Sequence, residues 1–466
     1  MYILVIIPLF LNLYHVRTWN VYGYMESQIP EQIHIALGEQ PSTISITWVT
    51  QENTESSTVL YGTMLLNMKS TGYVKEFIDG GREQRKMYMH RVILSDLIGN
   101  TTYYYKCGSL DGWSDVLKFR ALPSHPYWSP KIAVYGDMGT TDALSLPELI
   151  HQVKDLNSYD VVLHVGDFAY NMDSDNARVG DQFMRNIQPI ASKVPYMTCV
   201  GNHEAAYNFS NYKARFTMPG GDGESQFYSF NVGPAHIVAF SSELYYFLFY
   251  GWKTLVMQYD WLIKDLQEAN KPENRKNHPW IIVIGHRPMY CSNNFDPMHC
   301  DFENNIVRTG FDISPDHHKN VYLMGLESLF YQYGVDLIIA GHEHSYERFW
   351  PVYNRTVCNS TTSQNPYNNP NAPIHIVSGA AGSNEGKDTF IYGGKPWSAF
   401  RTTDFGFTRM TIHNVTHLEI EQISVENIQF EFFNYNRFGK TGRSRISLSA
   451  TNFKSLRNVN GIRGVK

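Results

Sequence analysis

The sequence predicts an all-β sandwich followed by an α/β domain built of stacked layers. Residues 30 to 123 contain short runs of β-forming residues separated by turn residues, without a helix-length apolar stripe. From Lys131 onward, short apolar strands alternate with amphipathic helical patterns, which is typical of an α/β domain with buried sheets. Between the two parts, residues 121–130 (ALPSHPYWSP) hold three prolines and indicate a linker.

The first part fits a sandwich of about 100 residues with seven or so strands. Its clearest strand candidates are IHIALG (33–38), TISITWV (43–49), STVLYG (57–62), MHRVILSDL (89–97) and TTYYYKCG (101–108). We expect this domain, of fibronectin-III-like type, to span residues 30 to 123. We also expect it to supply no metal ligand and to bury one side of the following domain.

The second part, expected over residues 130 to 425, contains six apolar strand candidates. They are KIAVYGD (131–137), VVLHVGD (161–167), PYMTCVGN (195–202), HIVAFSS (236–242), WIIVIGH (280–286) and VDLIIAGH (335–342). Helical patterns lie at residues 144–156, 258–269 and 321–333, and further β segments lie at 372–379 and 408–424.

The ends of the chain have their own compositions. Residues 2 to 16 form an apolar run that is shorter than the ~20 residues of a membrane helix, so we predict a signal peptide over residues 1–22. A membrane-retained signal anchor is the alternative. At the other end, residues 437–466 hold eight Lys or Arg and no acidic residue. We expect these residues to form a solvated tail within a basic carboxyl-terminal segment, 426–466.

Sequons and cysteines agree with export, to the outside of the cell or to the lysosome. Five N-x-S/T sequons mark candidate glycosylation sites at Asn100, Asn208, Asn354, Asn359 and Asn414. Five cysteines leave at least one unpaired within a monomer. Cys291 and Cys300 close a short loop and are the pair we expect to form a disulfide, whereas Cys199 lies in an apolar strand pattern and is expected to be a buried thiol.

The candidate chemistry lies where five of these strands end. Each ends in Gly followed by a polar or metal-binding residue, and the endings are Gly136-Asp137, Gly166-Asp167, Gly201-Asn202-His203, Gly285-His286 and Gly341-His342-Glu343-His344. In open α/β sheets, ligands bind beyond the carboxyl ends of the strands. We therefore expect these side chains to meet at one point.

The side chains delivered to that point are typical of a metal centre. They comprise two carboxylates, an amide, several imidazoles and the phenol Tyr170. Oxygen ligands mixed with imidazole suit Fe, Zn or Mn, and no thiolate is needed. Seven ligands exceed what one tetrahedral ion uses, but a pair of ions about 3.5–4 Å apart uses them all. A single Gly-Asp pair or a single strand-end His is common in turns and indicates no metal site by itself. Five such endings in this order, each after an apolar strand, do indicate one.

The same motifs carry a family resemblance. GDMG, GDFAY, GNHE, GHRP and GHEH follow the order seen in metallophosphoesterases, and the Tyr in GDFAY resembles the purple acid phosphatase branch. The sequence around IHIALG and ISITWVT is similar to the amino-terminal sandwich of large animal and plant members. The resemblance covers roughly residues 30 to 420.

The resemblance implies a role for each residue. It assigns Asp137, Tyr170 and His344 to a ferric ion, and Asn202, His286 and His342 to a second divalent ion, Zn, Fe or Mn. Asp167 would bridge the two ions. His203 would be a catalytic residue outside the metal shell that contacts the substrate phosphate.

Two regions depart from the family pattern. Plant members carry a His pair in the loop after the GHRP-like motif, but this loop reads MYCSNNFDPMHCD with one displaced histidine, His299. The acid that protonates the leaving group therefore stays open among His203, His299 and Glu343. The carboxyl-terminal segment also replaces the usual Trp-containing ending.

These observations favour an acid phosphatase that hydrolyses phosphate monoesters with a metal-bound hydroxide as nucleophile. Phosphodiester or nucleotide hydrolysis, or an inactive binding protein on the same fold, are the alternatives. Expected substrates are small phosphate esters or phosphoproteins. A net charge of −5 and a pI near 6.4 give no global attraction for nucleic acid, and we expect no membrane association once the signal is removed.

Overall fold

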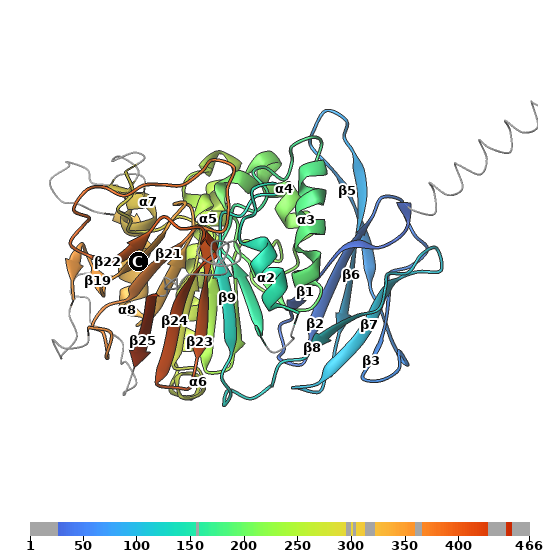
Figure 1. The fold of residues 1–466 in the computed structure, drawn as a ribbon, viewed down its shortest axis with the longest axis horizontal. Helices are drawn as coiled ribbons and strands as arrows, with labels where there is room; N and C mark the ends of the chain where they lie inside the picture. Colours follow the sequence, from blue (N-terminus) through green and yellow to red (C-terminus); the bar gives the residue numbers. More distant parts are fainter. Residues whose placement is uncertain are drawn as a thin grey trace, which may run out of the picture.

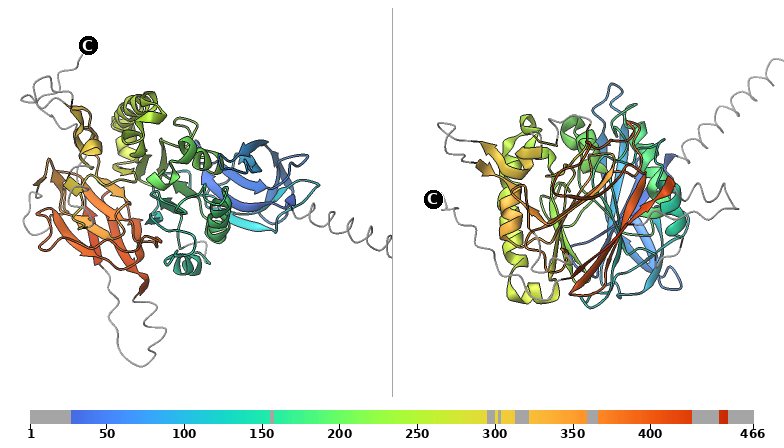
Figure 2. Two further views of the ribbon diagram at one scale, coloured as in Figure 1. Left: turned by 90° about the horizontal axis from the view of Figure 1, so that it is seen from above. Right: turned by 60° about the vertical axis from the view of Figure 1, so that its left-hand side comes forward.

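The structure is a computed structural model that describes residues 27–154, 158–294, 300–301, 304–312, 322–358, 366–426 and 444–449. A β-sandwich, blue in Figure 1, lies beside a larger domain in which two β-sheets stack face to face. Helices cover the outer faces of these two sheets, and the two further views in Figure 2 show the same arrangement. No helix among the described residues is both long and apolar enough to cross a membrane.

The sandwich consists of two four-stranded antiparallel sheets. In sheet order the first contains β1 (Glu31–Leu37), β2 (Ile44–Thr50), β6 (Lys86–Leu94) and β5 (Tyr73–Ile78). The second contains β4 (Met68–Thr71), β3 (Thr58–Gly62), β7 (Thr102–Gly108) and β8 (Leu117–Arg120). Alternate residues of β2 and β7 point into one shared apolar core, as expected for strands with one inward face.

Two sheets form the centre of the larger domain. The first runs β11 (Tyr196–Thr198), β10 (Val161–His164), β9 (Lys131–Tyr135), β23 (Gly406–Ile412), β24 (His417–Ser424) and β25 (Ser444–Ser449). The second runs β12 (Tyr228–Val232), β13 (Ala235–Ala239), β14 (Trp280–Ile284), β17 (Leu337–Ala340), β21 (Ile374–Ser378), β18 (Tyr346–Phe349) and β22 (Ser398–Thr402). Short hairpins are made by β15 (Gly310–Asp312) with β16 (Tyr322–Met324) and by β19 (Val352–Tyr353) with β20 (Thr356–Val357).

The helices follow the same layering. They are α2 (Leu146–Gln152), α3 (Arg178–Ala191), α4 (Ala206–Arg215), α5 (Trp252–Ala269), α6 (Pro272–Asn277), α7 (Asn304–Thr309) and α8 (Leu326–Gln332), with 3₁₀ turns η1 (Asn202–Glu204), η2 (Glu243–Tyr245) and η3 (Leu248–Tyr250). In Figure 1, α2 and α3 lie between the first sheet and the sandwich. Helices α5 and α8 pack on the outer face of the second sheet.

Strand β14 shows why the central strands are apolar along their whole length. Ile282 and Ile284 belong to the core between the two sheets, whereas Ile281 and Val283 belong to a second core under α5 and α8. Successive side chains of a strand point to opposite faces, so a strand covered on both sides needs a continuous apolar run.

The sandwich joins the larger domain through β1 and α3. Gln188 of α3 accepts a hydrogen bond from the Ile33 backbone N–H at 2.8 Å, and the sandwich and inter-sheet residues belong to one continuous buried cluster. The sandwich therefore covers one side of the larger domain, and the site residues described below all lie outside residues 30 to 123.

Some expected elements differ from those observed. Residues 321–333 are not one helix: Tyr322 and the residues up to Met324 pair with β15, and α8 begins only after Gly325. Helices α3 and α4 were not expected. Within the carboxyl-terminal segment, which was expected to be a solvated tail, β25 pairs with β24 and extends the first sheet, because the backbone N–H and C=O groups of an edge strand can pair with a further strand. The expected signal peptide, residues 1–22, and Asn359 lie outside the described residues.

A buried histidine in the sandwich makes stability depend on pH. His90 stacks on Trp48 with ring centroids 4.9 Å apart and is hydrogen bonded by the hydroxyls of Thr50 and Ser57. Burial lowers the pKa of His90 to about 4. The unfolded chain therefore binds a proton below pH 6.5 that the folded chain does not, so stability falls as the pH falls from about 6.5 to 4.

We expect His90→Gln to reduce this pH dependence by roughly 2–3 kcal/mol across that window. Urea unfolding of both proteins at pH 7 and pH 4.5 measures how strongly the free energy of unfolding depends on pH. If that dependence is the same in the variant and the wild type, the pKa of His90 is not lowered in the folded protein.

Candidate metal centre

Three site residues extend from the carboxyl ends of parallel strands in the first sheet. Asp137 follows β9, Asp167 follows β10 and Asn202 begins η1 after β11. The three strands pair in parallel, so their carboxyl ends share one edge of the sheet. Asp137 and Asp167 adopt positive φ values of 61° and 52°, a conformation that turns each carboxylate out of its strand direction.

Three more residues come from the second sheet. His286 follows β14, and His342 and His344 follow β17, its parallel neighbour. A direct contact joins the two sheets at this edge. The His342 N–H donates to both carboxylate oxygens of Asp137, at 3.0 and 2.9 Å. The site therefore lies across the junction of two sheets.

Glycine is required at two of these turns. A Cβ at Gly201 would lie 2.2 Å from Asp167 Oδ1, and a Cβ at Gly341 would lie 2.4 Å from Asp137 Oδ2. Both contacts are closer than any real Cβ makes. The glycines of the strand-end motifs thus allow the carboxylates to approach the neighbouring backbone.

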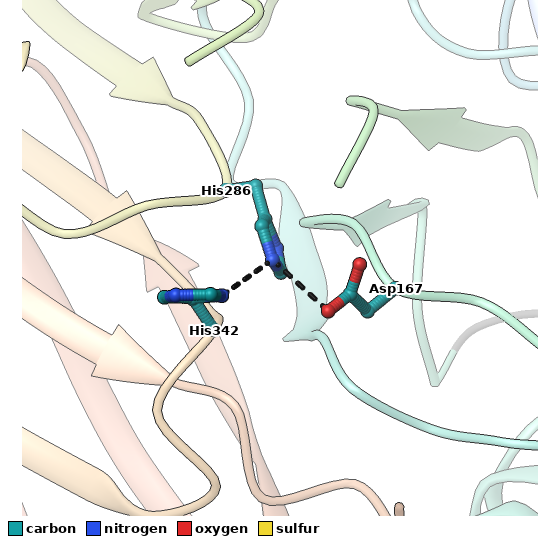
Figure 3. A group of neighbouring side chains, drawn as sticks. All are labelled: Asp167, His286 and His342. Carbon is teal, nitrogen blue, oxygen red and sulfur yellow. Dashed lines mark hydrogen bonds and ion pairs between the residues drawn. The ribbon is translucent and has the colours of Figure 1, made fainter. Parts of the chain in front are cut away.

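The first of two donor groups surrounds His286. Its Nε2 lies 3.1 Å from Asp167 Oδ2, 3.1 Å from Asn202 Oδ1 and 3.1 Å from His342 Nδ1, and Figure 3 shows the first and third of these contacts. The ligand atoms of Asp167, His286 and His342 all lie within 4.8 Å of one another. His286 Nδ1 is 2.9 Å from the Val165 carbonyl oxygen, which fixes the orientation of the ring.

The second donor group lies beside the first. Tyr170 Oη is 2.9 Å from His344 Nε2, and the same ring atom is 3.7 Å from Asp137 Oδ1. His344 Nδ1 faces the Gly386 carbonyl oxygen at 3.1 Å. The structure thus brings together all seven residues that the sequence selected as metal ligands.

These groups are buried and electrostatically coupled. Burial, with the nearby Asp167, raises the pKa of Asp137 well above its ordinary value. For Asp167 burial acts in the same direction, but His286 and then His203 outweigh it and lower the pKa. Burial alone would lower the pKa of His286, whereas Asp167 and Asp137 raise it to about 10. The raised pKa of Asp137 and of His286 thus marks a position where cations would offset the buried carboxylates.

The donor set fits a pair of metal ions. Two buried carboxylates, a phenol, an amide and three imidazoles converge from two sheets, and protein cores do not assemble such groups for packing. Phenolate and carboxylate oxygens suit a hard ion such as Fe(III), while imidazole and amide suit Zn, Fe(II) or Mn. The outer nitrogens of His286 and His344 face carbonyl oxygens, as those of metal-binding histidines do.

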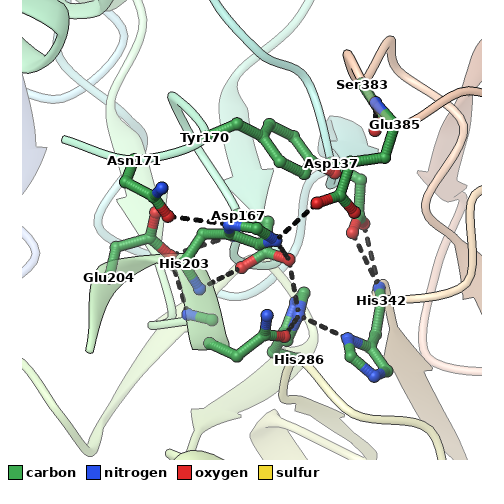
Figure 4. Close-up of polar contacts among 12 residues, drawn as sticks. Asp137, Asp167, Tyr170, Asn171, His203, Glu204, His286, His342, Ser383 and Glu385 are labelled. Atoms are coloured by element: carbon green, nitrogen blue, oxygen red, sulfur yellow. Dashed lines mark hydrogen bonds and ion pairs between the residues drawn. The ribbon is translucent and has the colours of Figure 1, made fainter. Parts of the chain in front are cut away.

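His203 lies beside the donor groups at the wall of a cavity of about 190 Å³. Its Nδ1 is 2.8 Å from Asn171 Oδ1, and the Tyr170 ring lies 4.5 Å away, centroid to centroid. Its Nε2 lies 3.5 Å from a Glu385 carboxylate oxygen. Figure 4 shows His203 and Asn171 on one side of Asp167 and the candidate metal ligands His286 and His342 on the other.

Several further residues belong to this site although the sequence patterns did not predict them. Glu385 and Asp388, from the loop after β21, line the cavity, and Asp388 accepts a hydrogen bond from the His344 N–H at 2.6 Å. Glu204 accepts hydrogen bonds from the Asp167 and Gly201 backbone N–H groups at 3.0 and 2.9 Å. Glu204 lies inside GNHE and was within reach of a sequence argument. Glu385 is separated from every motif, and no local signal marks it.

The loop after His286 is only partly described. His299 lies outside the described residues. Cys291 and Cys300 form a disulfide with Cα atoms 5.3 Å apart, and Cys300 lines the cavity. Glu343 is buried, and Cys291 Sγ lies 3.3 Å from its carboxylate. Burial, followed by Asp388 and Glu347, raises the pKa of Glu343 to about 8. Cys199 is a buried free thiol, as expected.

Stacked sheets with ligands at their shared carboxyl edge define a metallophosphoesterase domain. The family model for calcineurin-like phosphoesterases matches residues 130–346. Models for the purple acid phosphatase N-terminal domain and for an iron/zinc purple acid phosphatase-like C region match residues 30–121 and 372–430. The chain belongs to the purple acid phosphatase family.

Individual relatives agree with this assignment. The chain is 50% identical to acid phosphatase type 7 of mouse over 85% of its own length and 87% of the mouse protein. It is 31% identical to purple acid phosphatase 22 of Arabidopsis thaliana, over 82% and 79% of the two chains. A yellow lupin purple acid phosphatase structure, 24% identical, superposes with a TM-score of 0.72 over 91% of this chain and 74% of the lupin chain. That last similarity concerns the fold.

Proposed function

We propose that this protein is an acid phosphatase that hydrolyses phosphate monoesters at a ferric–divalent metal pair. The observation that carries the proposal is the convergence of seven donor side chains from five strand ends beside an open cavity. Family membership supports it, as do relatives that are themselves acid phosphatases. Asp137, Tyr170 and His344 would hold Fe(III), and Asp167 would bridge. Asn202, His286 and His342 would hold Zn, Fe or Mn.

The metal pair would offset the negative charge of the phosphoryl oxygens and lower the pKa of a coordinated water. The chain itself does the positioning. Asn171 holds Nδ1 of His203, so the ring keeps its Nε2 towards the cavity, where it contacts a substrate phosphate. The Tyr170 ring packs on His203 and prevents it from rotating away. The leaving-group acid is one of His203, His299 and Glu343.

We also propose that the protein is an exported glycoprotein that acts on small phosphate esters or phosphoproteins. A Cys291–Cys300 disulfide supports an oxidising compartment outside the cell or in the lysosome. The four sequon asparagines within the described residues, Asn100, Asn208, Asn354 and Asn414, are all exposed. Glycosidase treatment of protein from the medium of expressing cells tests both points.

Two measurements on one sample test the proposed activity. Elemental analysis should find about two metal ions per chain, one of them iron, and a nitrophenyl phosphate assay at acid pH should show turnover. A protein that binds both ions but prefers phosphodiesters would replace the monoesterase proposal with the alternative hydrolase. A protein with neither metal nor turnover would leave only the binding-protein alternative.

We expect Tyr170→Phe to remove a visible absorption band. A phenolate bound to Fe(III) gives a charge-transfer colour from pink to purple, and phenylalanine supplies no phenolate oxygen. Tyr170 is 8% exposed, so the ring should still pack on His203. The absorption spectrum, with the iron content of the same sample, makes the measurement. A colourless wild-type protein with one iron per chain would contradict the assignment of Tyr170.

We expect His203→Ala to slow the hydrolysis of nitrophenyl and alkyl phosphates alike, by about 10²-fold. Contact with the transferred phosphoryl group does not depend on the group that leaves. His299→Ala is the comparison, because loss of a leaving-group acid should slow the alkyl ester far more than the nitrophenyl ester. If His203→Ala slows only the alkyl ester, His203 is the acid instead.

A further inference from the structure

An exposed loop rich in aromatic residues lies near the candidate metal centre. This aromatic loop, residues 247–252 (FLFYGW), contains η3 and ends on the first residue of α5. Leu248, Phe249 and Trp252 are 39%, 75% and 62% exposed, and η3 has no buried residue. Large apolar side chains exposed together on one surface mark a contact with something outside the fold.

Packing fixes the base of the aromatic loop. Phe247 and Tyr250 both contact the Phe209 ring of α4, with ring centroids 5.7 and 5.9 Å away, and Phe209 is fully buried. Phe249 packs on Tyr250 at 4.4 Å but stays largely exposed. A Cβ at Gly251 would meet no atom within 4 Å. The loop is therefore a fixed tip that projects from the surface.

The aromatic loop follows a strand that ends at the same edge as the metal centre. Strand β13 is parallel to β14, and β14 is parallel to β17, so the segment after β13 begins on the same side as His286 and His342. Tyr246, just before the loop, stacks on Arg287 at 4.2 Å. Arg287 donates to Glu243 at 3.1 Å, and its Nη1 lies 3.1 Å from His342 Nε2. The tip and the cavity therefore share one side of the molecule.

Area and composition favour a lipid surface as the occupant of this tip. Three side chains exposed to these fractions present roughly 400 Å², whereas a stable protein interface takes about 800 Å² from each partner. Tryptophan and tyrosine prefer the boundary between lipid headgroups and acyl chains. Between Glu243 and Asp260 the chain has one basic residue, Lys253, and no acidic one, so no charge in this segment repels lipid phosphates.

We propose that the aromatic loop inserts into the interfacial region of a lipid bilayer and holds the protein at the membrane surface. This proposal replaces the expectation that the protein leaves the membrane once the signal is removed. Apolar contact provides the binding, so salt does not reverse it. The bound protein turns its cavity edge towards the bilayer. Phosphate esters carried by lipids are then within reach as substrates, a consequence that rests on the proposed function.

Flotation with phosphatidylcholine vesicles tests the proposal on full-length protein collected from the medium of expressing cells. The wild type should float with the vesicles, also in about 0.5 M NaCl. Phe249→Ser/Trp252→Ser should raise the lipid concentration for half-maximal binding by at least about 10-fold. Met64→Ser/Leu65→Ser is the matched control, because these sandwich residues are 89% and 73% exposed, and it should bind like the wild type. Turnover of nitrophenyl phosphate in solution should be equal in all three proteins.

Tryptophan fluorescence gives a second measurement that does not depend on the folding of the serine variant. Phosphatidylcholine with brominated acyl chains quenches tryptophans that reach those chains, so vesicles of this lipid should quench the wild type. Trp252→Phe keeps an apolar ring in the tip. It should therefore bind the vesicles as the wild type does and lose the quenching.

Three results would overturn the inference. The first is wild-type protein that does not float with the vesicles, and the second is a serine variant that floats equally well. The third is a wild-type dimer, seen by sedimentation without lipid, that becomes a monomer in the serine variant, because the aromatic loop would then join two protein chains. Wild-type protein that binds vesicles but hydrolyses neither nitrophenyl phosphate nor phosphatidic acid in the vesicles contradicts only the proposed function.

Discussion

Asp167→Asn is expected to release both metal ions and to lower phosphatase activity by about 10³-fold or more. The Asp167 carboxylate is 1% exposed and lies 3.1 Å from His286 Nε2. An asparagine of the same shape keeps the hydrogen bond from the His203 backbone N–H and loses only the negative charge between two cations.

Metal content and turnover of this variant should be compared with those of Asp175→Asn. Asp175 is an exposed carboxylate whose contact with Arg178 lies on the surface, and its loss should leave both metals and the activity unchanged. An Asp167→Asn protein with two ions at wild-type occupancy would show that Asp167 is not the bridging ligand.

Arg215→Met is expected to lower the free energy of unfolding by about 3–5 kcal/mol. Arg215 is 1% exposed and donates to Asp181 and to Gln32 of the sandwich, both at 2.9 Å. Arg85, also from the sandwich, pairs with the same Asp181. Removal of Arg215 takes one of two cations from the buried Asp181 and the donor from Gln32 Oε1, and it loosens the contact between the two domains.

Arg178→Met is the matched control for Arg215→Met. Arg178 begins α3 and pairs with Glu83 of the sandwich, but the two side chains are 45% and 51% exposed. An exposed pair contributes less than about 1 kcal/mol. Urea unfolding followed by tryptophan fluorescence compares both variants with the wild type. Equal losses in the two would mean that burial does not set the strength of the inter-domain ion pairs.

The sequence alone was sufficient to select the seven residues that converge at the candidate metal centre. Each follows a glycine or lies within a few residues of one, at the end of a short apolar run such as VVLHVGD or WIIVIGH. The strand, the turn and the functional residue are neighbours in the chain, so one local pattern contains all three. The order of the five motifs then indicated the family. The two-domain division likewise followed from local changes in periodicity.

The tertiary structure decided how those local units combine. It divided the strands between two sheets, and it brought Glu385 to His203 and Arg287 with Glu243 to His342. Arg215 was paired with residues of the other domain in the same way. Asp137 and His342, which join the two sheets, are separated by 205 residues, and the sequence around either one contains nothing that names the other. Such contacts arise only when whole sheets and helices pack, because the identity of a long-range neighbour depends on the burial of many apolar side chains at once.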